Sequence, residues 1–166
     1  MKSLGKYVIF LGQLLVRLET FRTYTRRTVD ESIKIGYNSV FIVTIVAAFM
    51  GAVTTLQTAY NLVSPLIPDP VIALVVRDMT LIELAPTITA IVFAGKVGSN
   101  IAGELGTMKI TEQVDALEVM GINAASYLVL PKIIASVLMF PVLVIMAAFI
   151  SIFGGYLTAV LSGVIS

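Results

Sequence analysis

Long apolar runs alternate with short polar segments along this chain. Residues 35–68 contain no charged side chain, and 38–60 is long enough to cross a bilayer as a helix, which takes about 20 residues. Two further apolar runs cover 81–103 and 133–163. The end of the last run is too short to span separately, so it extends the third helix or folds back. The pattern predicts an all-α integral membrane protein with three transmembrane helices, at 38–60, 81–103 and 133–163.

The first 34 residues follow a different pattern. Their apolar positions recur at intervals of three and four, which places them on one face of a helix, and basic residues fall off that face. We interpret 1–34 as a basic region with an amphipathic helix that lies in the membrane interface. The alternative is a cleaved signal peptide, which needs an unbroken apolar core and a small-residue cleavage site. Neither feature is present in this segment. The apolar face consists of Leu4, Tyr7, Val8, Leu11, Leu14, Leu15 and Leu18.

The distribution of basic residues predicts an orientation. Residues 1–34 hold seven of the eleven Lys and Arg residues, and cytoplasmic segments are enriched in these residues. The N-terminus is therefore expected on the cytoplasmic side. The segment 64–80 contains three prolines and a single Arg, which predicts an irregular outer loop followed by a short helix after Pro70.

Small residues recur at helical spacing in the predicted spanning helices. Ala47 and Gly51 are four residues apart in the first, and the second carries two adjacent rows of small residues. Pro86 removes one backbone hydrogen bond in the second helix and is expected to kink its outer half. Small residues let helix backbones approach closely in lipid. Both ordinary bundle packing and a specific role in dimer contact or motion remain open. The two rows are Ala90, Ala94, Gly98 and Ala102, and Gly95, Ser99 and Gly103.

Polar side chains also occur within the second spanning helix. Glu83 lies near its outer end, where a carboxylate is costly in lipid, so it faces a cavity or partner or extends to water. Lys96, Asn100 and Glu104 are four residues apart and share one helical face. They form either a proton or ion path or a structural pairing, and we favour the structural pairing because Glu104 lies next to the cytoplasmic turn.

A short charged segment separates the second and third apolar runs. It predicts an amphipathic helix over 111–120, too short to cross a bilayer and therefore at the membrane surface. We expect Gly106 and Thr107 to break the preceding helix, Thr111 to act as the N-cap and Gly121 as the C-cap. The pattern alone is typical of a solvated connector as well as of a docking element. One side carries Glu112, Asp115 and Glu118, and another carries Val114, Leu117 and Met120.

Composition restricts the function classes. The chain is 58% hydrophobic and 13% charged, whereas soluble domains are about 25% charged, so 35–166 forms one membrane domain. The net charge of +1 argues against a nucleic-acid partner. The sequence has no Cys, no His and no phosphate-binding loop, so we expect no metal, no cofactor and no catalysis by this chain itself.

Two stretches resemble one family of transporters. They read ELAPTITAIVFAGKVGSNIAGELGTMKITEQVDALEVMGINAASYLVLPKIIA and IGYNSVFIVTIVAAFMGAVTTLQTAYNL. Both are similar to MlaE-type permeases, the membrane subunits of ABC transporters of phospholipid that are linked to MCE-domain proteins. The resemblance extends from about residue 30 to the end of the chain.

The resemblance implies roles for two groups of residues. In the family the Glu of the Glu-Leu-x-Pro motif, here Glu83, lies near the lipid cavity of a dimer, and Gln57 is expected there too. Family members often have Arg before that Glu, where this chain has Ile82, so Arg77 would have to approach by another route. The family's coupling helix inserts into a groove on the cytoplasmic ATPase. Here it comprises Glu112, Gln113, Asp115, Ala116, Leu117, Glu118, Met120 and Gly121.

The implied function is a non-catalytic permease subunit in the cell inner (cytoplasmic) membrane. It would act as a homodimer with ABC ATPase subunits and an MCE-domain lipid-binding protein, and move phospholipids between membranes. The family usually has two further spanning helices beyond this point, so we expect a truncated permease, either a fragment or one part of a split subunit. The alternative is a small membrane scaffold or channel-like protein with no ATP coupling.

Overall fold

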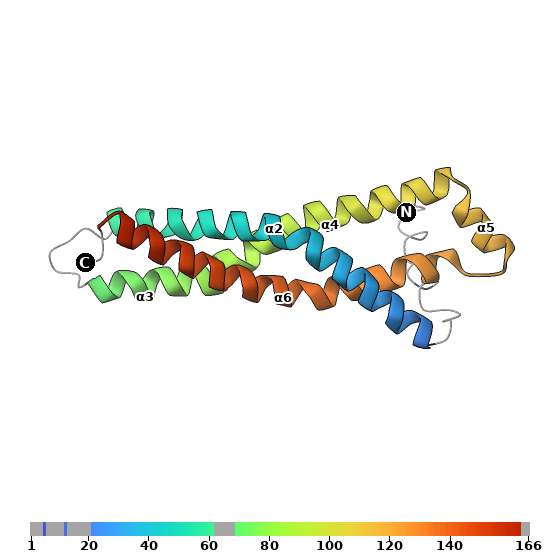
Figure 1. Ribbon diagram of the computed structural model, residues 1–166, viewed down its shortest axis with the longest axis horizontal. Helices are drawn as coiled ribbons and strands as arrows, with labels where there is room; N and C mark the ends of the chain where they lie inside the picture. Colours follow the sequence, from blue (N-terminus) through green and yellow to red (C-terminus); the bar gives the residue numbers. More distant parts are fainter. Residues whose placement is uncertain (1–4, 6–11, 13–20, 62–68, 164–166) are drawn as a thin grey trace. The chain divides into compact units, whose positions relative to one another are not determined.

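The computed structural model describes residues 5, 12, 21–61 and 69–163. Within these residues the structure consists of helices joined by short turns, and no strand occurs among them. This confirms the prediction of an all-α protein. The elements in Figure 1 are α2 (Phe21–Asn61), α3 (Asp69–Met79), α4 (Ala85–Ile110), α5 (Gln113–Val119) and α6 (Ala124–Leu161), with a π-helix, η1 (Thr80–Leu84), between α3 and α4.

Three helical stretches are long and apolar enough to cross a membrane, which confirms the predicted number of spans for the described part of the chain. They are Tyr24–Asn61, Ala73–Ile110 and Ala124–Leu161. The predicted runs fall on these three stretches, but the helices continue beyond the apolar residues. At the C-terminal end α6 extends through Gly154 and Gly155 to Leu161, so the last apolar residues lengthen the third helix and do not fold back.

No helix ends at residue 34, where the sequence pattern separates the N-terminal region from the membrane domain. Residues 21–34 are the first part of α2, which runs without interruption into the first apolar run. No proline occurs between Phe21 and Asn61, so nothing in the sequence ends the helix at that point. Most of the predicted interfacial helix, including its apolar face, lies outside the described residues.

The chain divides into two compact units, each built from segments of α2, α4 and α6. Unit 1 comprises Met1–Tyr37 and Lys96–Met139, and includes α5. Unit 2 comprises Asn38–Gly95 and Phe140–Ser166, and includes α3 and η1. Both units therefore bring together residues that are distant in the sequence.

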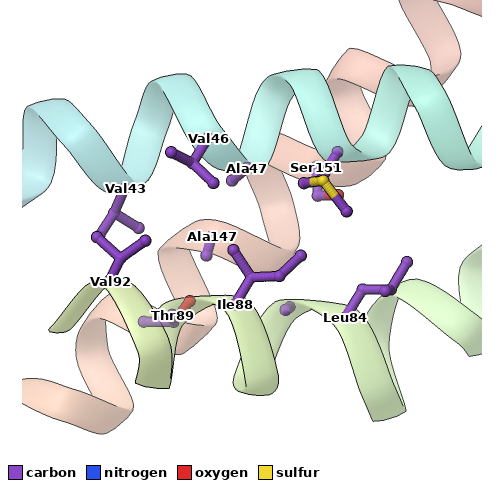
Figure 2. A pocket seen from close by; sticks show the side chains of 11 residues that line it. Val43, Val46, Ala47, Leu84, Ile88, Thr89, Val92, Ala147 and Ser151 are labelled. Carbon is purple, nitrogen blue, oxygen red and sulfur yellow. The ribbon is translucent and has the colours of Figure 1, made fainter. Parts of the chain in front are cut away.

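Unit 2 has a small apolar core between three helices. Val43 and Ala47 of α2 are buried with Ala147 of α6, and Val92 of α4 packs against them. Figure 2 shows side chains from these helices pointing into one shared space, which leaves a cavity of about 10 Å³. Since that volume is about the size of one water molecule, the space between the side chains of this core is closely filled.

The closest approach of two backbones in unit 2 occurs at glycines. A Cβ atom on Gly51 of α2 would collide with the backbone of Ser151 in α6. On the opposite side, a Cβ on Gly154 would come within 2.6 Å of the Ala48 carbonyl oxygen. This confirms that the small residues at Ala47 and Gly51 allow another helix to approach, and identifies α6 as that helix.

Pro86 is accommodated by a change of helix type directly before it. In η1 the Ala85 N–H donates to the Thr80 carbonyl, five residues earlier, and not to the residue four earlier as in an α-helix. Proline has no N–H, and its ring clashes with the carbonyl four residues before it. A wider π-helical turn relieves that clash. The distortion expected at Pro86 therefore takes the form of η1.

The glycines in the small-residue rows of α4 make no close contact with another helix among the described residues. A Cβ atom added at Gly95, Gly98 or Gly103 would meet no atom within 4 Å. The close packing that the sequence predicts for α4 is thus absent from the described part of the chain, where the tight helix contact lies between α2 and α6. Of the row residues, Ala94, Gly95, Gly98, Ser99, Ala102 and Gly103 are exposed and Ala90 is partly buried.

Candidate functional site

The short helix α5 joins α4 to α6, and its start differs from the prediction (Figure 1). The helix α4 does not break at Gly106 and Thr107 but continues to Ile110. Thr111 is not an N-cap, because its hydroxyl donates to the Thr107 carbonyl at 2.9 Å and so completes the last turn of α4. A threonine hydroxyl can bond to the carbonyl four residues back, and here this contact competes with capping.

Glu112 takes the position before α5 and adopts a left-handed conformation, with φ of 57°. Its side chain makes no capping hydrogen bond. Side chains with a Cβ rarely adopt this conformation, which is typical of the residue that follows a helix end. Glu112 therefore marks a sharp change of direction between α4 and α5.

The end of α5 matches the prediction. Gly121 has φ of 76°, its N–H donates to the Glu118 carbonyl at 2.9 Å, and the Ile122 N–H donates to the Leu117 carbonyl at 3.0 Å. This pair of bonds is a Schellman motif, in which glycine is the favoured left-handed residue. The predicted C-cap at Gly121 is confirmed, and it fixes the direction in which the chain enters α6.

The surface of α5 combines carboxylates with large apolar side chains. No residue of α5 is buried, while Val114 and Leu117 are partly covered. Val119 is 88% exposed and Ile110, at the end of α4, is 84% exposed. Apolar side chains exposed beside charges are typical of a docking surface. Of the residues expected in the coupling helix, Glu112, Gln113, Asp115, Ala116, Glu118, Met120 and Gly121 are exposed.

A second group of polar side chains, in unit 1, surrounds Lys132 of α6. The Lys132 side chain is only 4% exposed, and its ammonium group lies 2.6 Å from Glu104 Oε2 of α4 and 3.0 Å from Glu31 Oε1 of α2. The second oxygen of Glu104 accepts from Lys34 of α2 at 3.2 Å. We call Glu31, Lys34, Glu104 and Lys132 the charge cluster. It joins three helices and contains two positive and two negative groups.

The charge cluster corrects the pairing expected along α4. Glu104 binds Lys34 and Lys132, and among the described residues Lys96 makes no ion pair. Asn100 lies exposed on the same helix. The sequence pattern did not single out Lys132 and Glu31, because their contact joins positions about one hundred residues apart.

Two further polar contacts connect α2 to the start of α6. The hydroxyl groups of Tyr24 and Ser126 are 2.7 Å apart. Arg27 donates to the Tyr127 hydroxyl at 2.5 Å, and its guanidinium carbon lies 3.7 Å from the centre of the Tyr127 ring. The residues of α2 that make these contacts recur at intervals of three and four, so they share one helical face. The polar face formed by Tyr24, Arg27, Glu31 and Lys34 is a sequence signal from which this contact could have been predicted.

A polar cavity of about 300 Å³ lies beside the charge cluster. Its lining includes Arg27 and Asp30 as well as three members of the cluster. Within the described residues no group of three or more His, Cys, Asp and Glu side chains could hold a metal ion. The site therefore offers ion pairing and hydrogen bonding.

The two residues expected at a lipid cavity, Glu83 and Gln57, are both exposed in unit 2. Neither lines the cavities described in this unit. Arg77 donates to Asp78 Oδ1 at 2.7 and 2.9 Å, so the guanidinium group pairs with the neighbouring residue and not with Glu83. Arg77 also borders an apolar cavity of about 170 Å³ with Thr55 and Tyr156. The role of Glu83 and Gln57 stays a prediction.

Comparison with known protein families matches residues 28–166 to the family Permease MlaE. The chain belongs to the MlaE permease family. A protein of Rickettsia bellii named "Probable ABC transporter permease protein" is 36% identical over 159 residues, which cover 96% of this chain and 61% of that protein. A protein of Synechocystis with a similar name is 37% identical over 144 residues, or 87% of this chain and 54% of that protein.

This chain therefore spans about 61% and 54% of the length of these two relatives. A third relative, a probable ABC transporter permease of Pyropia yezoensis, is 36% identical over 140 residues, which cover 84% of this chain and 53% of that protein. The family and the three helices capable of spanning together indicate a multi-pass membrane protein.

Proposed function

We propose that this chain is a permease subunit of an ABC transporter that moves phospholipids between membranes, and that α5 is the coupling helix through which a partner ATPase acts. The observation that carries the proposal is α5 itself. In a chain of the MlaE permease family, α5 joins two helices capable of spanning and exposes carboxylates beside large apolar side chains. These are features that a groove on another protein can bind.

The proposed mechanism is mechanical. The chain contains no phosphate-binding loop, so ATP is bound and hydrolysed by the partner, and this chain is not an enzyme. Closure of the ATPase on ATP displaces α5, and the displacement passes into α4 and α6, which are continuous with it through short turns. The transported phospholipid would occupy a cavity near Glu83 and Gln57 that forms when two copies of the permease associate.

Two structural features support the remaining parts of the proposal. The exposed small-residue rows of α4 offer a surface on which a second copy can approach closely, consistent with a homodimer. The basic residues before the first apolar run favour a cytoplasmic N-terminus in the inner membrane. An MCE-domain lipid-binding protein is the expected partner on the other side.

The proposal is tested by reversing charges on α5. The chain is co-expressed with an ABC ATPase and an MCE-domain protein from the same organism, and the complex is purified and assayed for ATP-dependent transfer of phospholipid. Replacing Glu112, Asp115 and Glu118 with Lys should abolish both co-purification of the ATPase and lipid transfer, because three contacts of one docking surface reverse sign. Mass spectrometry of lipid extracted from the wild-type complex identifies the substrate class.

A matched pair of single variants controls for general effects of charge. Asp115→Lys should reduce the amount of bound ATPase, whereas Asp30→Lys, at an exposed acid of α2, should leave it unchanged. ATPase binding and lipid transfer that survive the triple reversal would contradict the assignment of α5. A wild-type chain that never associates with an ATPase would favour the alternative of a membrane scaffold or channel.

A further inference from the structure

We propose that Lys132 is a positioning residue for ATPase coupling, which holds α2, α4 and α6 together at the base of α5 so that they move as one body. The inference rests on the proposed function of α5 and goes beyond it. It assigns a role to a side chain that lies outside α5 and lines no lipid cavity described above. The inference is based on one arrangement: the buried ammonium group of Lys132 lies between the carboxylates of Glu31 and Glu104, which come from two other helices.

The first step concerns how α5 is held in place. Because no residue of α5 is buried, the helix has no core of its own that could fix its position. Its orientation must be set by the helices attached to its two ends, α4 and α6. The contact of 2.6 Å between Lys132 Nζ and Glu104 Oε2 connects these two helices close to α5. This pair closes the base of the α4–α5–α6 hairpin.

The second step extends the connection to α2. Lys132 also binds Glu31 at 3.0 Å, and Glu104 also binds Lys34 at 3.2 Å, so each side of the hairpin holds α2 separately. The contacts of Tyr24 with Ser126 and of Arg27 with Tyr127 continue this attachment towards the start of α6. A force applied to α5 therefore reaches α2 as well as the two helices that flank α5.

The third step follows from burial. Lys132 is 4% exposed, whereas the partner carboxylates are 23% and 30% exposed, so the ammonium group lies at the centre of the charge cluster. Separating a buried charge from its partners is strongly unfavourable, whereas replacing a whole buried ionic set with apolar groups is often tolerated. The pairs thus resist relative movement of the three helices, and we expect a variant that replaces the whole set at once to fold.

These properties separate a positioning role from a purely structural one. The neutral triple variant Glu31→Gln, Glu104→Gln and Lys132→Met removes the ion pairs and leaves no isolated charge at these three positions. It should retain bound ATPase and ATP hydrolysis but reduce ATP-dependent lipid transfer about tenfold, a typical size for a coupling between sites. A structural role alone would leave transfer per folded complex unchanged.

Two variants serve as controls. Reversing the whole charge cluster, with Glu31→Lys, Lys34→Glu, Glu104→Lys and Lys132→Glu, retains every pair with opposite sign and should restore much of the transfer. Lys96→Met removes a lysine of α4 that makes no ion pair among the described residues, and should transfer lipid at the wild-type rate. Wild-type transfer by the neutral triple variant would overturn the inference while leaving the proposed function intact.

A second measurement does not depend on how the charge variants fold. The chain has no cysteine, so Tyr24→Cys with Ser126→Cys gives a unique thiol pair between α2 and α6. Joining the two thiols with a short bifunctional reagent should leave lipid transfer unchanged, because the helices already move together. Loss of transfer on cross-linking would overturn the inference. A wild-type complex that binds no ATPase would instead refute the proposed function.

Discussion

At the scale of single residues, the contacts within unit 1 and those within unit 2 are of different kinds. In unit 1 the buried Lys132 satisfies two carboxylates, and the surrounding contacts are polar. In unit 2 the helices meet through Gly51, Gly154 and Gly155, where absence of a side chain permits backbone contact. An ion pair or hydrogen bond requires a definite distance and angle between its two groups. Backbone contact at a glycine requires only that no larger side chain lies between the two helices. Substitutions in the two units therefore have different consequences.

Gly51→Ala should destabilise the protein. The added methyl group would collide with the backbone of Ser151, which cannot move away as a flexible side chain can, so we expect a loss of about 1–3 kcal/mol of folding free energy. The measurement is thermal stability in detergent, followed by size-exclusion chromatography after heating. Gly106→Ala is the matched control, because a Cβ there meets nothing within 4 Å and alanine favours a helix. Equal stability of the two variants would contradict this reading of the α2–α6 contact.

At the scale of elements, the features that depend on local sequence could be predicted, namely the helices formed by long apolar runs. The contacts between residues that are distant in the sequence could not be predicted. The three spans and the glycine cap of α5 follow from local pattern and conformation, and the structure contains both. The ion pairs of the charge cluster join residues that are far apart in the sequence: Glu104 lies 70 positions from Lys34 and 28 from Lys132, and Lys132 lies 101 positions from Glu31. The N-cap predicted at Thr111 is wrong for a local reason. The Thr111 hydroxyl can bond either to an N–H of the following helix or to the carbonyl four residues before it, and it bonds to the Thr107 carbonyl.

The Schellman motif after α5 provides a prediction at this scale. Gly121→Ala places a Cβ on a residue with φ of 76°, which costs about 1 kcal/mol, and should loosen the last turn of α5. We expect weaker association with the ATPase, measured as the ratio of the two subunits after purification, and faster hydrogen exchange in α5. Gly121→Asn should be milder, because asparagine tolerates the left-handed conformation better. Equal loss in both variants would indicate that side-chain size at this position matters, and not backbone conformation.

At the scale of the whole molecule, α2, α4 and α6 each contribute to both units, so each unit is covalently continuous with the other through three helices. Every tight helix contact found within unit 2 involves α2 and α6 glycines, while the glycines of α4 face open space. A helix surface of small residues that is left open is suited to a contact with another chain in the membrane. The proposed homodimer supplies such a chain.

Gly98→Leu tests whether α4 makes that contact. A leucine side chain would hold two backbones apart, so the variant should lose the dimer, or weaken it about tenfold or more, while each chain still folds because a Cβ at Gly98 meets nothing within 4 Å. Oligomeric state is measured by mass photometry of the complex in nanodiscs. Val137→Phe adds bulk at an exposed position of α6 in the same unit and should leave the dimer intact. A stable dimer of the Gly98→Leu variant would place the interface on another helix, since bulk in the centre of a close small-residue contact cannot be accommodated without separating the backbones.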